Sequence, residues 1–174
     1  PASHDKFLGM LGMHGTYEAN LAMHGCDVML NIGARFDDRV TGRISGFSPK
    51  STKIHCDIDT SSVNKNVAVD LAIIGDATII LEMLIDEMKR QSFEAHKPSL
   101  DKWWGMISGW RKLDCLAFDQ SGDIIKPQYA IKRLCEMTAK HDVYVTTEVG
   151  QHQMWAAQYF DFEKPNRWMP SGGL

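Results

Sequence analysis

The sequence lacks several features that mark large classes of proteins. Its four cysteines form no Cys-x-x-Cys pair for zinc or dithiol chemistry, and no stretch approaches the length of a bilayer-spanning helix. The first residues, PASHDKFLGM, have neither the basic segment nor the apolar core of a signal peptide. The formal charge of -3 provides no broad cationic surface for a nucleic-acid backbone. We therefore expect a cytoplasmic protein in a reducing environment, which binds neither nucleic acid nor a membrane.

Two ligand motifs are also missing. The dinucleotide fingerprint Gly-x-Gly-x-x-Gly is absent, since Gly33 alone follows the first expected strand. The seven histidines show no metal-binding spacing, because His14 and His24 are too far apart for one helical face and His55 lies within an expected strand. We predict structural roles for these histidines and no metal ligand in this chain.

The chain instead has an ordinary globular composition in which short apolar runs alternate with amphipathic segments. With 174 residues, 44% hydrophobic and 24% charged, it is long enough for one sizeable core or a little more. Asp76 is placed to cap a helix over residues 77–90. The pattern predicts helices at 16–26, 77–90, 100–113 and 127–138, and strands at 27–32, 52–58, 71–74 and 142–147. Such alternation is typical of an α/β layered fold with a mainly parallel sheet.

Polar residues follow the expected strands, at the edge where open parallel sheets bind ligands. In NIGARFDDRVTG (31–42), four charged residues come directly after the first strand; from the pattern alone, a solvated and mutually paired loop is favoured by about two to one. Asp57 and Asp59 end the second strand, where they could bind a ribose or cap the next turn. Gln151 and His152 follow a glycine at a later strand end, where they could reach an anion, although a loop histidine without that role is commoner.

Three stretches resemble one enzyme family closely. They are LGMLGMHGTYEANLAMHGCDVMLNIGARFDDRVTG (8–42), IHCDIDTSSVNKNVAVDLAIIGDA (54–77) and TEVGQHQMWAAQYF (147–160). They resemble the catalytic large subunit of acetohydroxyacid synthase, also called acetolactate synthase, which is a thiamine diphosphate-dependent enzyme. The resemblance covers essentially the whole chain and is weakest over residues 91–125.

The resemblance implies a division of the chain into parts of two domains. Residues 1–90 are expected to form a Rossmann-like central flavin-binding domain that lacks its N-terminal part. Residues 91–125 are expected to be a linker and a tryptophan-rich helix, and residues 126–174 the start of a truncated α/β domain that binds thiamine diphosphate. The chain would thus be an internal fragment, with the pyrimidine-binding domain and the magnesium-binding Gly-Asp-Gly motif outside it.

The resemblance also implies cofactor-binding residues. Gln151 and His152 match positions beside the diphosphate of thiamine diphosphate, and no catalytic residue or Mg²⁺ ligand falls within the chain. The positions that match FAD contacts are Met13, His14, Gly15, Gly33, Ala34, Arg35, Asp37, Arg39, Val40, Asp57, Ile58, Asp76 and Ala77.

The implied activity is that of a transferase of branched-chain amino acid biosynthesis. It decarboxylates pyruvate and ligates the hydroxyethyl unit to a second 2-oxo acid, pyruvate or 2-oxobutyrate. In the family the full-length subunit forms homodimers and is controlled by a regulatory small subunit. The fragment alone is expected to be inactive, because the glutamate that activates the thiamine ring belongs to the first domain. Two alternatives stay open: a related thiamine diphosphate enzyme, such as glyoxylate carboligase or oxalyl-CoA decarboxylase, and a non-catalytic nucleotide-binding module.

Overall fold

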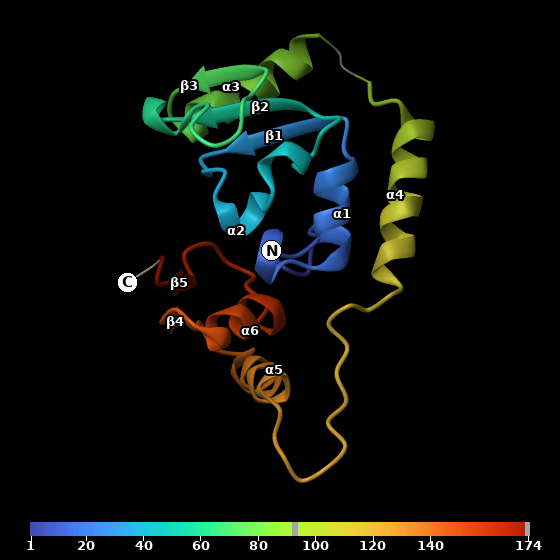
Figure 1. Cartoon of the computed structure of the whole chain (residues 1–174), viewed down its shortest axis with the longest axis vertical. Helices are drawn as coiled ribbons and strands as arrows, with labels where there is room; N and C mark the ends of the chain where they lie inside the picture. The colour runs from blue at the N-terminus through green and yellow to red at the C-terminus, as the bar shows by residue number, and fades with distance from the viewer. Residues whose placement is uncertain (92–93, 173–174) are drawn as a thin grey trace. The chain divides into compact units, whose positions relative to one another are not determined.

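The chain divides into two compact units, whose elements are labelled in Figure 1. The computed structural model describes residues 1–91 and 94–172. We call Asn20–Lys112 the sheet unit, and Pro1–Ala19 together with Leu113–Leu174 the terminal unit. Of the predicted linker over 91–125, Ser92 and Phe93 lie outside the described residues, as do Gly173 and Leu174 of the predicted C-terminal domain. The predicted domain limits stay predictions.

The sheet unit is built on three parallel strands in the order β1-β2-β3. Its elements are most of α1 (Tyr17–Gly25), then β1 (Val28–Ile32), α2 (Asp38–Thr41), η2 (Ile44–Gly46), β2 (Thr52–Asp57), η3 (Thr60–Ser62), β3 (Leu71–Ile74), α3 (Ala77–Arg90) and α4 (Lys97–Arg111). The pairing aligns Ile32 with Cys56 and Cys56 with Ile73, so the three strands end side by side. This arrangement confirms the predicted α/β fold with a parallel sheet.

The core of the sheet unit includes one residue of the charged loop after β1. Phe36 is buried with Phe47 and Val67, and its ring meets that of Phe47 edge-on at 5.8 Å between centroids. The Nδ2 of Asn66 also donates a hydrogen bond of 2.8 Å to the Phe36 carbonyl. The loop is therefore fixed to the core from its middle, while its charged residues stay at the surface.

The terminal unit contains a second, two-stranded parallel sheet. It consists of η1 (Gly12–His14), α5 (Pro127–Thr138), β4 (Val145–Thr147), α6 (Gln151–Tyr159) and β5 (Trp168–Pro170). Helix α6 contacts α5, η1 and β4, which makes it the central element of this unit. In the described part of the chain, no helix combines the length and apolar character that crossing a membrane requires.

The bounds of several elements agree with the sequence prediction, and others differ for local reasons. β3, α3 and α5 begin and end where predicted. The fourth predicted strand begins at Val145 rather than at Asp142, because its partner β5 begins at Trp168, which pairs with Val145. α6 and β5 were not predicted, and α2 forms a helical turn inside the charged loop. The polar residues Gln151 and His152 therefore belong to a helix, not to a loop.

Candidate functional site

The predicted flavin residues of the sheet unit gather at the carboxyl edge of its sheet. The N–H of Gly33 donates to the Cys56 carbonyl at 2.8 Å, and that of Gly75 donates to the Asp57 carbonyl at 3.0 Å. These bonds continue the pairing past the strand ends, so the turns that follow β1, β2 and β3 leave the sheet next to one another. We call this edge the strand-end site; its residues are Gly33, Ala34, Arg35, Asp37, Arg39, Asp57, Ile58, Asp76 and Ala77.

Gly33 shapes the first turn of the strand-end site. Its φ of 62° lies in the left-handed region, which glycine adopts without the clash that a Cβ brings. Apart from Gly33 and the residues adjoining it, no heavy atom of the described residues lies within 4 Å of the position that a Cβ would occupy there. The Nδ2 of Asn31 closes the turn with a 2.6 Å hydrogen bond to the Ala34 carbonyl. The backbone at Gly33 is therefore open to a ligand.

The charged residues after this turn pair with their neighbours. Arg35 Nη2 lies 3.1 Å from Asp37 Oδ2, and Arg39 Nε lies 4.0 Å from Asp38 Oδ2. Such exposed pairs contribute at most about 1 kcal/mol each, so an anionic ligand can displace them. Val40, which the resemblance also assigns to flavin, packs against the core cluster of Phe36. The side chains thus form the mutually paired loop that the pattern predicts.

The two aspartates at the end of β2 have different surroundings. Asp59 caps η3 by accepting hydrogen bonds from the N–H and the hydroxyl of Ser61, both at 2.9 Å, and these bonds lower the pKa of its carboxyl group. Asp57 is 9% exposed, and its Oδ1 accepts a 2.9 Å hydrogen bond from the Asp59 N–H. Ile58, between them, is 72% exposed. Asp59 is therefore occupied by the turn, which leaves Asp57 as the carboxylate at the strand end.

Asp76 caps α3, as the sequence predicted. Its Oδ1 accepts hydrogen bonds from the N–H groups of Thr78 at 2.8 Å and Ile79 at 3.4 Å. These are two of the four N–H groups that a helix start leaves without an internal partner. The position that the resemblance assigns to the adenine side of FAD thus has a structural task of its own.

Two substitutions of Asp76 separate the effect of its capping from the effect of its charge. We expect Asp76→Ala to lower the free energy of unfolding by about 1 kcal/mol, because two helix N–H groups lose their acceptor. Asp76→Asn keeps an acceptor oxygen and is expected to stay within a few tenths of a kcal/mol of the parent protein. Urea denaturation followed by circular dichroism measures both values. Equal losses in the two variants would show that the charge of Asp76, not its capping, stabilises α3.

The predicted thiamine diphosphate residues lie in the terminal unit, at the start of α6. Gly150 precedes the helix with a φ of 154°, and a Cβ there would come within 3.0 Å of the His152 ring. Gln151 and His152 form the first turn of α6, where backbone N–H groups and the helix dipole favour an anion. The η1 turn, which contains the predicted flavin residues Met13 and His14, contacts α6, and Gly15 closes it with a 2.9 Å N–H bond to the Gly12 carbonyl.

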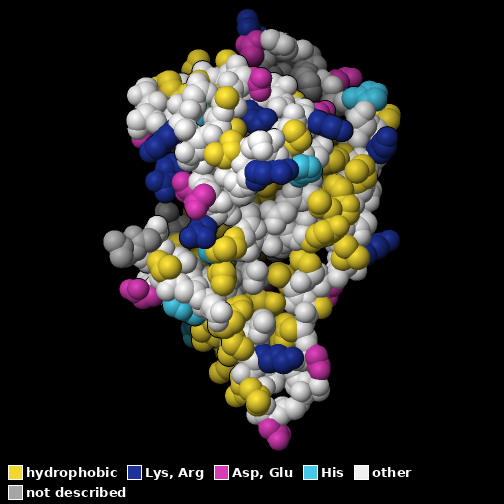
Figure 2. All heavy atoms as spheres, viewed as in Figure 1, with side chains coloured by type: hydrophobic (Ala, Val, Ile, Leu, Met, Phe, Trp, Pro, Cys, Tyr) yellow, Lys and Arg dark blue, Asp and Glu magenta, His cyan; other side chains and the backbone are white. Residues whose placement is uncertain are grey.

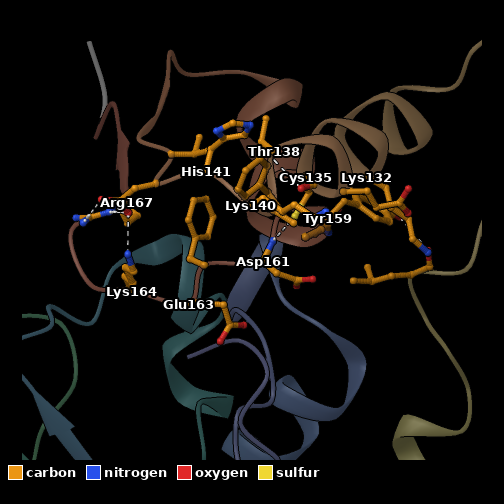
Figure 3. Close-up of a pocket in the computed structure, with 18 of the residues that line it drawn as sticks. Lys132, Cys135, Thr138, Lys140, His141, Tyr159, Asp161, Glu163, Lys164 and Arg167 are labelled. Atoms are coloured by element: carbon orange, nitrogen blue, oxygen red, sulfur yellow. Dashed lines mark hydrogen bonds and ion pairs between the residues drawn. The ribbon is translucent and has the colours of Figure 1, made fainter.

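A pocket of about 1070 Å³ also lies in the terminal unit (Figure 3). It is lined by α5, residues 139–143 and residues 158–164, and it contains none of the predicted cofactor residues. Asp142 accepts hydrogen bonds from Arg167 Nε at 2.9 Å and Lys164 Nζ at 3.1 Å, and the Arg167 guanidinium lies 4.3 Å from the centre of the Tyr144 ring. These contacts connect the segment before β4 to the segment before β5, which is a structural role.

The ion pairs of Asp142 with Arg167 and Lys164 predict that the stability of the fold depends on pH. The hydrogen bonds from Arg167, and then Lys164, lower the pKa of the Asp142 carboxyl from its ordinary 3.8 to about 2. A folded-state pKa below the unfolded value means that these ion pairs stabilise the fold above pH 4 and lose this contribution as the pH falls towards 2. We expect Asp142→Asn to have a lower urea midpoint than the parent protein at pH 6, and the difference to shrink by pH 2.5. A difference that stays constant between these pH values would contradict the assignment.

The sequence interpretation missed a contact between the strand-end site and a neighbouring residue. His55, which was expected to have a structural role, is fully buried, and its Nε2 lies 3.3 Å from Asp57 Oδ2. Residues two apart on a strand share a face, so the spacing of His55 and Asp57 indicates this pair. Among the residues that the structure describes, no three His, Cys, Asp or Glu side chains come together as a metal site.

Comparisons with known proteins find relatives along the whole chain. Residues 1–84 match the family model of the thiamine pyrophosphate enzyme central domain, and residues 148–174 match that of the C-terminal TPP binding domain. The whole chain is 48% identical to the acetolactate synthase isozyme 3 large subunit of Escherichia coli (strain K12). It is 45% identical over its whole length to the acetolactate synthase large subunit of Buchnera aphidicola subsp. Acyrthosiphon pisum, and 42% to the acetolactate synthase of Mycobacterium leprae.

The chain spans 28–30% of the length of these three relatives, but they cover 100% of it. The two family models match its two ends in the order in which a central domain and a C-terminal domain follow one another. The chain therefore belongs to the thiamine pyrophosphate enzymes and, within them, is similar throughout to the large subunit of acetolactate synthase.

Proposed function

We propose that the chain is the flavin-binding and cofactor-domain portion of an acetolactate synthase large subunit. The observation that carries this proposal is the side-by-side arrangement of the turns after β1, β2 and β3, which gathers Arg35, Asp57 and Asp76 at one edge of the sheet. The relatives are named acetolactate synthases. The resemblance supplies the proposed reaction, which is decarboxylation of pyruvate and ligation to pyruvate or 2-oxobutyrate in branched-chain amino acid biosynthesis.

FAD is the cofactor proposed for the strand-end site. Arg35 and the open backbone at Gly33 would receive its diphosphate, and Asp57 would accept hydrogen bonds from a ribose. The donor and acceptor types fit this assignment. The Asp59 N–H holds the Asp57 carboxylate in place, and the exposed apolar side chain of Ile58 beside it is suited to an adenine ring. Asp76 and Ala77 would contribute through the start of α3.

Thiamine diphosphate is the cofactor proposed for the terminal unit. When bound, it supplies the electron sink that decarboxylation of a 2-oxo acid needs. Gln151 and His152 would hold its diphosphate at the start of α6, through side-chain donors and the free N–H groups of the first turn. Met13, His14 and Gly15, in the neighbouring η1 turn, would add flavin contacts, and Mg²⁺ would be bound by residues other than those of this chain.

The remaining proposals concern the whole protein. We propose residues 1–90 as part of the central domain, 91–125 as linker and tryptophan-rich helix, and 126–174 as the start of the C-terminal domain, in a cytoplasmic homodimer with a regulatory small subunit. Exposed apolar side chains support contacts with further protein: α4 exposes Leu100 and Met106, and Figure 2 shows hydrophobic side chains gathered in the region of this helix.

A binding measurement tests the flavin proposal. Titration of the purified chain with FAD is expected to quench flavin fluorescence, and ADP is expected to restore it by competing for the adenine end. Binding of ADP or coenzyme A without binding of FAD would favour a related thiamine diphosphate enzyme or a nucleotide-binding module. Failure to bind any of the three would contradict the strand-end site.

An activity measurement tests whether the chain alone can catalyse the reaction. The chain alone is expected to form no acetolactate from pyruvate, even with FAD, thiamine diphosphate and Mg²⁺ present, because none of its residues is assigned to the chemical step. Colorimetric detection of acetolactate above the level of a heat-denatured sample would contradict this expectation.

A further inference from the structure

The imidazole of His55 is buried without a hydrogen bond. Its side chain is fully inaccessible, and neither Nδ1 nor Nε2 has a hydrogen-bond partner among the described residues. Nε2 lies 3.3 Å from Asp57 Oδ2, within ion-pair distance, but the ring N–H is not aligned well enough for a hydrogen bond. Buried polar groups are nearly always satisfied, because leaving one without a partner is costly. This exception therefore calls for a physical reason.

Surrounding groups fix the position of the ring and of the carboxylate it faces. The ring of Phe36 meets the imidazole edge-on at 5.2 Å between centroids, and Phe36 is itself held in the core cluster. The backbone N–H of Asp59 donates to Asp57 Oδ1 at 2.9 Å, so the backbone fixes the position of this oxygen. Oδ2 is the oxygen that faces His55, and its position depends on the imidazole.

We propose that His55 is a positioning residue for ribose recognition: it aligns the Asp57 carboxylate to accept hydrogen bonds from ribose hydroxyls of an adenine nucleotide. This inference rests on the proposed flavin function and extends it to a residue that does not touch the ligand. Ligand binding draws Oδ2 into line with the imidazole, so that the Nε2–H donates to Oδ2 while the other lone pairs of the carboxylate receive the hydroxyls. The Nε2–H of His55 thereby gains an acceptor when the ribose is bound.

Calorimetric titration of the full chain with ADP and with 2′,3′-dideoxy-ADP tests the proposal, because the two ligands differ only in the ribose hydroxyls. The parent protein is expected to prefer ADP by at least about tenfold, since hydrogen bonds to a charged group are among the strong ones. In His55→Leu this preference is expected to fall to about twofold or less, with the affinity for dideoxy-ADP unchanged. His55→Gln, whose amide can donate to Asp57, is expected to keep most of the preference.

A second measurement is made on the parent protein, with His55→Gln used only to assign the resonances. The imidazole ¹⁵N resonances of His55, assigned by comparison with His55→Gln, are expected to shift when the parent protein binds ADP and to stay nearly unchanged with dideoxy-ADP. If His55 has a purely structural role, His55→Leu will lower the affinities for ADP and dideoxy-ADP equally, and the two ligands will shift the ¹⁵N resonances of the parent protein by the same amount. Either result would overturn the proposal. Binding of ADP and FAD with an intact preference in His55→Leu would overturn the role of His55 alone, whereas no binding by the parent protein would overturn the flavin function as well.

Discussion

Phe36→Ala is expected to lower the free energy of unfolding by about 3–5 kcal/mol, because it removes a buried aromatic side chain and leaves a cavity. Phe36 is 7% exposed and packs against Phe47, Val67 and the ring of His55. The loss is a large part of the total stability of a small domain, which is typically about 5–15 kcal/mol. Urea denaturation followed by tryptophan fluorescence and circular dichroism measures it.

Met83→Ala is the matched control for this substitution. Met83 is 68% exposed on α3, so its truncation is expected to change the unfolding free energy by no more than about 0.5 kcal/mol. Phe36→Ala is also expected to weaken FAD binding, since Phe36 holds the loop that carries Arg35 and Asp37. A loss below about 1 kcal/mol in Phe36→Ala would show that the loop is not anchored through the core.

Asp57→Asn is expected to raise the dissociation constant for FAD and ADP roughly 10- to 100-fold, because a charged acceptor of ribose hydrogen bonds becomes a neutral amide. The carboxylate is secured by the Asp59 N–H at 2.9 Å, so the substitution changes the chemistry of a fixed position. Calorimetric titration of both ligands gives the constants. Equal affinity of the parent protein and the variant would remove Asp57 from the site.

Asp70→Asn is the control for the removed charge. Asp70 precedes β3 at the opposite end of the strand, and its Oδ2 accepts a 2.7 Å hydrogen bond from the Lys53 N–H. Asparagine keeps an acceptor oxygen there, so nucleotide affinity is expected to stay the same. A comparable loss in Asp70→Asn would point to the overall charge of the unit as the cause.

The elements that the sequence predicted well carry their own local determinants. α3 combines regular apolar spacing with the cap at Asp76, and α5 begins at Pro127 and keeps the helical spacing. α6 gave no such pattern, because Met154, Trp155, Ala156 and Ala157 are consecutive and encircle the helix instead of forming one face. β5 has three residues and exists through its pairing with β4, a contact that no local pattern encodes.

For the candidate site, too, the sequence indicated some features, whereas others depend on tertiary contacts. Resemblance supplied the residue set, and the parallel register explains why Arg35, Asp57 and Asp76 lie at one edge. The cap at Asp76 followed from the helical pattern, but neither the pattern nor the resemblance indicated that Val40 packs in the core. The burial of His55 against Phe36 depends on the loop folding back over β2, which spacing along the chain does not contain.

The anchoring of the charged loop through Phe36 has a consequence for its kinetics. The N–H groups of Val40 and Thr41 donate to the Asp37 carbonyl at 3.0 and 2.9 Å, directly beside the buried ring. Exchange of these amide hydrogens for deuterium requires the loop to lift, and lifting it pulls Phe36 out of the cluster with Phe47. The amide hydrogens of the loop should therefore exchange as slowly as those of the buried core, although the loop lies at the surface.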